Sequence, residues 1–153
     1  MNKTAIILLS GGLDSLVSLD IARKTCDVKM ALTFNYGQKA FEEEKEASTE
    51  ISKFYNIEHK IIDLPFLRDL TNNALTNPDD DKLDDFSSVW IPNRNGLFLN
   101  IAGCFCDKNK FDYIIFGANK EEARDFPDNS EEFAKIADEF FSFATLQKPK
   151  IFA

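Results

Sequence analysis

The apolar and polar residues of this chain alternate in a way that predicts a regular succession of strands and helices. Short apolar runs alternate with longer segments in which apolar residues recur every three or four positions. The expected strands are residues 4–9, 27–34, 58–64 and 113–116, with the start of another at 148–153. The expected helices are 14–24, 38–56, 97–107 and 131–144, with a short turn or helix at 65–70. This order predicts one doubly wound α/β domain over residues 1–153, with a mostly parallel sheet and helices on both faces.

The pattern breaks over residues 71–90, which are rich in Asn, Asp and Pro. These residues favour turns, so we expect a long loop here. Long loops without regular structure are often functional. Two interpretations stay open: an acidic surface loop, and a lid that orders over a substrate.

The first expected strand runs directly into a glycine-rich turn, and a helix is expected to follow at once. The sequence of the turn is Leu9-Ser10-Gly11-Gly12-Leu13-Asp14-Ser15. Backbone N–H groups at such a turn converge, and the helix dipole adds positive potential. The serine hydroxyls add donors, and the Asp14 carboxylate could hold Mg²⁺. The alternative is a structural turn with capping serines, but the concentration of donors favours binding of an anion, and a nucleotide phosphate above all.

Known nucleotide-binding patterns narrow the interpretation of this turn. No Gly-Lys-Ser/Thr follows the glycines, which excludes a Walker A loop. The spacing is not Gly-x-Gly-x-x-Gly either, so the dinucleotide-binding fingerprint is not supported. The turn is therefore a phosphate-binding candidate of another kind.

Composition and charge point to a small-molecule substrate. The chain has 153 residues, and 18 Lys and Arg against 26 Asp and Glu give a net charge of −8. A protein that binds nucleic acid along its backbone needs a basic surface, so we expect no direct nucleic-acid binding. The apolar run after Met1 is too short to cross a membrane, and we expect no membrane association. Three cysteines suggest reduced thiols in a cytoplasmic protein.

Three other sets of residues have a structural interpretation. Cys104 and Cys106 should face different directions on a helix, so we expect small core residues and no metal pair. The acidic run at 42–46 is expected to be a solvated helix face. His59 is the only histidine, and we expect it to be either hydrogen-bonded or exposed on its strand.

Two further turns follow expected strands, and a third precedes an expected helix. Tyr36-Gly37-Gln38 and Gly117-Ala118-Asn119 come after strands, where open α/β sheets bind their ligands. Arg94 lies in the third turn, between Pro92 and Gly96. An arginine there can bind phosphate or carboxylate bidentately, or it can be an exposed turn residue; both interpretations stay open.

Taken together, these segments resemble a known family. The turn at 10–15 matches the pyrophosphate-binding loop of the N-type ATP pyrophosphatases, whose fold is adenine nucleotide alpha hydrolase-like and Rossmann-like. The turn at 36–38, the sequence Ile91-Pro92-Asn93-Arg94-Asn95-Gly96, and the segments 117–119 and 126–128 occur in the order seen in the 7-cyano-7-deazaguanine synthase (QueC) family. The resemblance covers essentially all of the chain.

The resemblance implies a carbon–nitrogen ligase of queuosine and archaeosine biosynthesis. Such an enzyme uses ATP and Mg²⁺ to convert 7-carboxy-7-deazaguanine and ammonia to 7-cyano-7-deazaguanine through an adenylated carboxylate. It implies catalytic roles for Asp14 and Arg94, with Asp14 also at Mg²⁺. The implied nucleotide-binding residues are Leu9, Ser10, Gly11, Gly12, Leu13, Asp14, Ser15, Tyr36, Gly37 and Gln38. The implied substrate-binding residues are Arg94, Asn95, Asn119, Glu122 and Asp128.

The sequence also departs from the family pattern. Lys39 is followed by Ala40, where a basic residue and His are common, and residues 123–130 differ from the usual segment. The zinc-binding cysteine cluster at the C-terminal end of the family is absent, so we expect a truncated chain and Zn²⁺ only in a full-length member. Two alternatives remain: a QueC-like amide-forming or AMP-transferring ligase with another acceptor, and a non-catalytic ATP-binding fragment. The phenylalanines late in the chain suggest either a homodimer surface or a core exposed by truncation.

Overall fold

A five-stranded parallel sheet forms the centre of the computed structural model, which describes residues 2–70, 75–77, 90–118 and 124–152. The strands lie in the order β3-β2-β1-β4-β5, and every neighbouring pair is parallel. Their bounds are β1 Thr4–Leu8, β2 Asp27–Asn35, β3 Glu58–Asp63, β4 Tyr113–Ile115 and β5 Lys150–Phe152. The predicted parallel sheet is confirmed, including the strand expected near residue 150.

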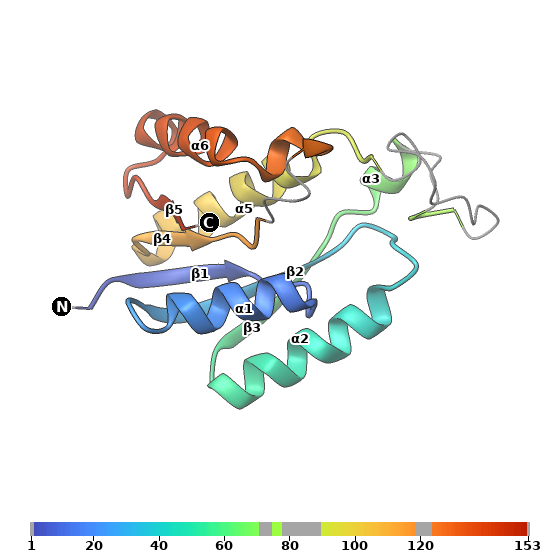
Figure 1. The fold of residues 1–153 in the computed structure, drawn as a ribbon, viewed down its shortest axis with the longest axis horizontal. Helices are drawn as coiled ribbons and strands as arrows, with labels where there is room; N and C mark the ends of the chain where they lie inside the picture. The colour runs from blue at the N-terminus through green and yellow to red at the C-terminus, as the bar shows by residue number, and fades with distance from the viewer. Residues whose placement is uncertain (1, 71–74, 78–89, 119–123, 153) are drawn as a thin grey trace.

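Helices cover both faces of the sheet (Figure 1). Helices α1 Leu13–Ala22 and α2 Phe41–Tyr55 lie on one face, and α5 Arg94–Asn109 and α6 Glu131–Ala144 lie on the other. Two short elements, α3 Phe66–Asp69 and η2 Pro127–Asn129, belong to the connections. The chain moves outward from β1 to β3 and then returns past β1 to β4 and β5. Because parallel crossovers are right-handed, this reversal places the two pairs of helices on opposite faces, and the doubly wound fold is confirmed.

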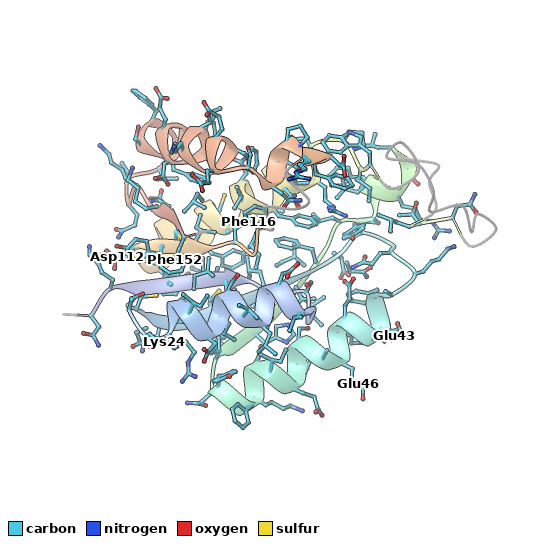
Figure 2. All side chains as sticks on the ribbon, in the orientation of Figure 1. Lys24, Glu43, Glu46, Asp112, Phe116 and Phe152 are labelled. Carbon is cyan, nitrogen blue, oxygen red and sulfur yellow. The ribbon has the colours of Figure 1, made fainter. Side chains whose placement is uncertain are left out.

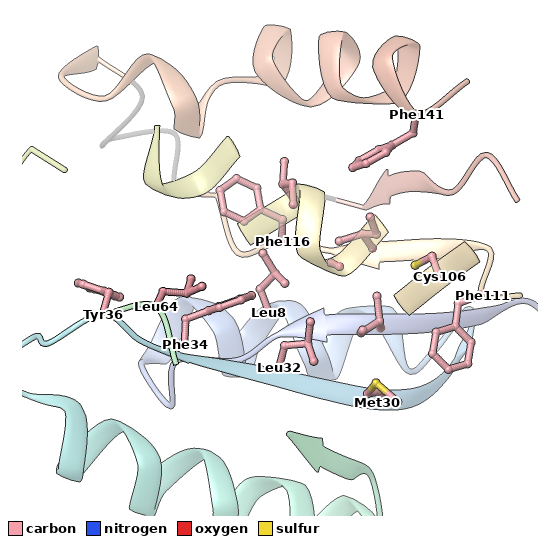
Figure 3. Close-up of a cluster of buried hydrophobic side chains, with 14 of the residues drawn as sticks. Leu8, Met30, Leu32, Phe34, Tyr36, Leu64, Cys106, Phe111, Phe116 and Phe141 are labelled. Atoms are coloured by element: carbon pink, nitrogen blue, oxygen red, sulfur yellow. The ribbon is translucent and has the colours of Figure 1, made fainter. Parts of the chain in front are cut away.

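The central strand is buried on both sides, which explains its uninterrupted apolar sequence. Ile6 and Leu8 belong to a core cluster with α5 and α6, whereas Ala5 and Ile7 belong to a cluster with α1. Figure 3 shows the first cluster between the sheet and α5 and α6. No helix in the described ranges is long and apolar enough to cross a bilayer.

Helices α2 and α5 begin several residues away from their predicted starts. Helix α5 begins at Arg94, because Asn93 adopts a left-handed conformation and its carbonyl accepts the N–H of Leu97 at 2.9 Å. The expected turn around Arg94 is therefore the first turn of the helix. Helix α2 begins at Phe41, after a turn in which the Gln38 side chain accepts the N–H of Tyr36 at 2.9 Å.

The two cysteines on α5 face different directions, as expected. Cys106 is buried, but Cys104 is exposed, so the expectation that both belong to the core is wrong for Cys104. The reason is their spacing of two residues, which on a helix places only one of them toward the sheet.

His59 is held by hydrogen bonds, which agrees with one of its two expected environments. Its Nε2 lies 2.8 Å from Thr33 Oγ1, and its Nδ1 lies 3.4 Å from Thr49 Oγ1. The imidazole is half-buried, and this burial lowers its pKa from 6.5.

We expect the NMR titration of the imidazole to have its midpoint below 6.5 in the folded protein and near 6.5 in concentrated urea. The chain has one histidine, so one imidazole signal reports this environment. A pKa lowered on folding means that the unfolded state binds more protons. The contribution to stability is present above pH 6.5 and is lost as the pH falls through the folded pKa. A folded midpoint at or above 6.5 would contradict the prediction.

Candidate functional site

A cavity of about 280 Å³ lies at the carboxyl edge of the sheet, where β1, β2 and β4 end. The residues that line it come from distant parts of the sequence: Leu8, Leu9, Ser10, Gly12, Leu13, Asp14, Ser15, Leu32, Phe34, Tyr36, Glu44, Arg94, Asn95, Phe98, Phe116, Gly117 and Asn129. The fold thus brings most of the predicted glycine-rich turn together with Tyr36, Arg94 and Asn95.

The turn after β1 is shaped by close packing against α2. Gly11 has a φ of +80°, and a Cβ at this position would lie 2.7 Å from Ala47 Cβ. A larger residue is therefore excluded by both conformation and space. Ser10 Oγ accepts the N–H of Gly12 at 3.3 Å, and Ser15 Oγ donates to the Gly12 carbonyl at 2.9 Å. The two hydroxyls also lie 3.3 Å apart, so the serines order the turn from within.

The start of α1 forms the wall of the cavity at this turn. Its N-cap is Gly12, which has no side chain to accept a hydrogen bond from the first helical N–H groups. These N–H groups lack partners within a helix. Together with the helix dipole they form a site that can accept an anion.

Arg94 faces Tyr36 across the cavity. Arg94 Nη1 donates to Tyr36 Oη at 3.3 Å, and the guanidinium carbon lies 5.6 Å from the centre of the Tyr36 ring. Burial raises the pKa of the Tyr36 hydroxyl. As the first residue of α5, Arg94 adds its charge to the positive end of the helix dipole, an arrangement that disfavours the isolated helix. The two positive features together favour a negatively charged ligand.

A carboxyl group lies beside Arg94 and Asn95. Burial raises the pKa of Asp128, while the charge of Arg94 and a hydrogen bond from the Asn95 side chain lower it. Asp128 Oδ1 is buried and has no hydrogen-bond partner among the described residues. Asp128 thus holds an unsatisfied acceptor next to two residues of the cavity wall, Arg94 and Asn95, without lining the cavity itself.

Some predicted residues lie elsewhere. Gly11, Gly37, Gln38 and Asp128 are not among the residues that line the cavity. The Gln38 amide is buried and donates to the Phe34 carbonyl at 2.9 Å and to Glu44 Oε2 at 2.8 Å. Gln38 therefore supports the cavity wall from behind. Asn119 and Glu122 lie outside the described residues.

Glu44 lines the cavity although it was not predicted to belong to the site. It was expected on a solvated helix face, but its side chain is half-buried and lines the cavity. Burial raises the pKa of this carboxyl, and the hydrogen bond from Gln38 and the charge of Arg94 oppose that effect. The helical spacing does indicate that Glu44 faces inward, because it places Glu44 on the same face of α2 as the buried residues Ser48 and Ser52.

Aromatic side chains form another part of the cavity wall. The rings of Phe34 and Phe98 stack with their centres 4.0 Å apart, and Phe98 lies 5.8 Å from Tyr36. Figure 3 shows Phe34 and Tyr36 at the same end of the core as Leu64. Neither phenylalanine was predicted to belong to the site, because a buried aromatic residue in a sequence is first of all a core residue.

The fold and the glycine-rich turn together define the class of adenine nucleotide alpha hydrolase-like proteins. U34-tRNA thiolase NcsA from Methanococcus maripaludis superimposes with a TM-score of 0.57 at 21% identity, over 98% of this chain and 51% of that one. NH3-dependent NAD synthetase from Campylobacter jejuni superimposes with a TM-score of 0.52 at 19% identity, over 79% of this chain and 49% of that one. At such identities the likeness establishes the fold alone.

Sequence comparison identifies the family. The family model described as queuosine biosynthesis protein QueC matches residues 4–153, and the chain belongs to this family. A relative from Pelotomaculum thermopropionicum, named 7-cyano-7-deazaguanine synthase, is 42% identical over 96% of this chain and 73% of its own length. A relative of the same name from Methanosarcina barkeri is 41% identical over 97% of this chain and 72% of its own length.

Proposed function

We propose that the protein is an ATP-dependent carbon–nitrogen ligase that converts 7-carboxy-7-deazaguanine and ammonia to 7-cyano-7-deazaguanine in the cytoplasm. One observation carries the proposal: a single cavity joins the turn at Ser10–Ser15, which is suited to phosphate, to Arg94 and Asn95. The family and the names of its relatives supply the reaction.

The chemistry requires activation of a carboxylate. A carboxylate is a poor electrophile because its leaving group would be oxide. Attack of a carboxylate oxygen on the α-phosphorus of ATP releases pyrophosphate and gives an acyl adenylate. Ammonia then displaces AMP to form an amide. Attack of the amide oxygen on a second ATP releases pyrophosphate, and loss of AMP together with both N–H protons then leaves the nitrile.

The residues in and around the cavity have distinct roles in the proposed reaction. The turn at Leu9–Ser15 would bind the pyrophosphate through backbone N–H groups and hydroxyls. Tyr36 would lie beside the adenylate, where Gly37 and Gln38 support the wall. Arg94 would stabilise the negative charge that develops on the α-phosphate. Asn95 and Asp128 would bind the deazaguanine ring, where a carboxylate accepts ring N–H donors; we assign Asn119 and Glu122 to the same side.

Asp14 would hold the Mg²⁺ that accompanies ATP. It lies at the start of α1 and lines the cavity beside the phosphate-binding turn. One carboxylate together with phosphate oxygens and water suits Mg²⁺, which seldom has a ligand set made only of protein groups. Bound there, the ion would neutralise the charge of the phosphates.

Cys106 does not suit zinc. Burial raises the pKa of the Cys106 thiol to about 12, whereas a zinc ligand must be a thiolate. Within the described ranges, no group of three His, Cys, Asp or Glu residues is arranged to hold a metal ion. No step of the proposed reaction depends on zinc.

The test is to incubate the protein with ATP, Mg²⁺, ammonium and 7-carboxy-7-deazaguanine. We expect AMP, pyrophosphate and the nitrile to form together, and no AMP without the acid. Accumulation of the amide without nitrile would favour an amide-forming ligase instead. ATP binding by calorimetry without AMP formation under any of these conditions would contradict the proposal and favour a non-catalytic module.

A further inference from the structure

Glu44 is an unexpected group in a cavity built for anions. The start of α1, the start of α5 and the Arg94 guanidinium all favour negative charge there. A carboxylate cannot assist phosphate oxygens, which it repels. Glu44 nevertheless occupies the wall of this cavity, half-buried and within the electrostatic influence of Arg94. A ligand group that such a carboxylate can bind is one that donates hydrogen bonds or carries positive charge.

A hydrogen bond from Gln38 orients the Glu44 carboxylate. Gln38 Nε2 donates to Oε2 at 2.8 Å and also donates to the Phe34 carbonyl at 2.9 Å. Gln38 Oε1 accepts the backbone N–H of Tyr36 at 2.9 Å. The buried Gln38 amide thus uses its groups to join the carboxylate to the end of β2. Such support is typical of a group that acts on a ligand.

The surroundings of Glu44 suit a small cation. The stacked Phe34 and Phe98 rings and the Tyr36 ring belong to the same cavity wall. Faces of aromatic rings attract cations, and the Tyr36 oxygen is a further acceptor. The neighbouring acidic residues differ from Glu44, because Glu43 and Glu46 are exposed and project away from α2 (Figure 2).

We propose that Glu44 binds ammonium and removes one of its protons, which generates ammonia beside the acyl adenylate. This inference rests on the proposed function, because ammonium is the cationic reactant of that reaction. The proton of NH₄⁺ moves to the Glu44 carboxylate. The nitrogen lone pair then attacks the carbonyl carbon of the adenylate, the C–O bond to AMP breaks, and the proton lost from the new C–N centre passes to the departing phosphate or to water. Burial suits the carboxyl to this exchange because it favours the protonated form.

The test compares Glu44→Gln with Glu43→Gln. Glutamine retains an oxygen that can accept the Gln38 hydrogen bond, and Glu43 is an exposed neighbour outside the cavity. Two assays separate the steps. Exchange of pyrophosphate into ATP that depends on 7-carboxy-7-deazaguanine, measured without ammonium, reports adenylation. Nitrile formation at increasing ammonium concentrations reports the use of ammonia. We expect Glu44→Gln to keep the exchange rate within about twofold and to lose about 10²-fold in kcat/KM for ammonium.

The pH dependence adds a readout that a structural role would not give. Raising the pH supplies free ammonia from solution, so the defect of Glu44→Gln should shrink as the pH rises from 7 to 9. Glu43→Gln should match the parent protein throughout. Loss of exchange in Glu44→Gln would overturn the proposal in favour of nucleotide or Mg²⁺ binding. An unchanged kcat/KM for ammonium would overturn it as well.

A binding measurement separates this proposal from the proposed function. Titration with ammonium chloride should shift the backbone NMR signals of Phe34 and Tyr36 in the parent protein and in Glu43→Gln. The same signals should not shift in Glu44→Gln. Titration with sodium chloride is the reference. If the parent protein forms no nitrile yet shows these shifts, the proposed reaction fails and the cation site stands. If nitrile forms and the shifts are equal in Glu44→Gln, the cation site fails alone.

Discussion

Replacing Arg94 with alanine is expected to lower kcat/KM for nitrile formation by about 10²–10³, the usual effect of removing one donor that stabilises transition-state charge. Arg94 carries a full charge at the start of α5, and its Nη1 lies 3.3 Å from Tyr36 Oη in the cavity wall. Removing it also leaves Asp128 and Glu44 without the charge that favours their ionised forms. Steady-state kinetics with ATP and the carboxylic acid measures the effect.

The matched variants are Arg94→Lys and Arg23→Ala. Lysine restores the charge without the bidentate geometry, so we expect an intermediate rate. Arg23 lies at the end of α1, with its guanidinium 4.1 Å from the centre of the Tyr55 ring, and does not line the cavity. Its loss should leave kcat/KM unchanged. A rate for Arg94→Ala equal to that of Arg23→Ala would remove Arg94 from the mechanism.

The fold was predictable because the dominant signals are local. The apolar run at 4–9 is long enough for a strand buried on both faces, and the polar faces of α2 and α6 repeat at helical spacing. The boundaries were less predictable. Helix α5 begins at Arg94 because Asn93 adopts a left-handed conformation, and the sequence does not reveal which residue of an Asn-Arg-Asn-Gly segment does so.

The candidate site was predictable where the motif itself forms the wall, as at Ser10 and Asp14. The part of the site that depends on contacts between two elements was not predictable. Glu44 is acidic within an acidic run, and only the packing of α2 against Gly11 shows that it turns inward. The contact of Asn95 with Asp128 joins α5 to η2, which lie far apart in the sequence. Such contacts depend on tertiary structure, which local patterns do not encode.

The phenylalanines late in the chain divide into buried and exposed members of α6. Phe141 is 2% exposed and lies against α5 at Gly103, where an added Cβ would come 2.5 Å from its ring. Phe143 is 85% exposed on the same helix. Figure 3 shows Phe141 extending from α6 toward the sheet. The helix thus anchors Phe141 in the core, while Phe143 stands among the exposed residues of its outer face.

Phe141→Ala is expected to lower the free energy of unfolding by about 3–5 kcal/mol, because it removes a buried ring and leaves a cavity between α5 and α6. That loss is a large fraction of the roughly 5–15 kcal/mol that stabilises a typical domain. Phe143→Ala should change stability by no more than about 0.5 kcal/mol, as an exposed substitution does. Urea unfolding followed by circular dichroism measures both variants under the same conditions. Equal effects of the two substitutions would show that the outer face of α6 is covered in solution, since only a packed Phe143 could cost as much as Phe141.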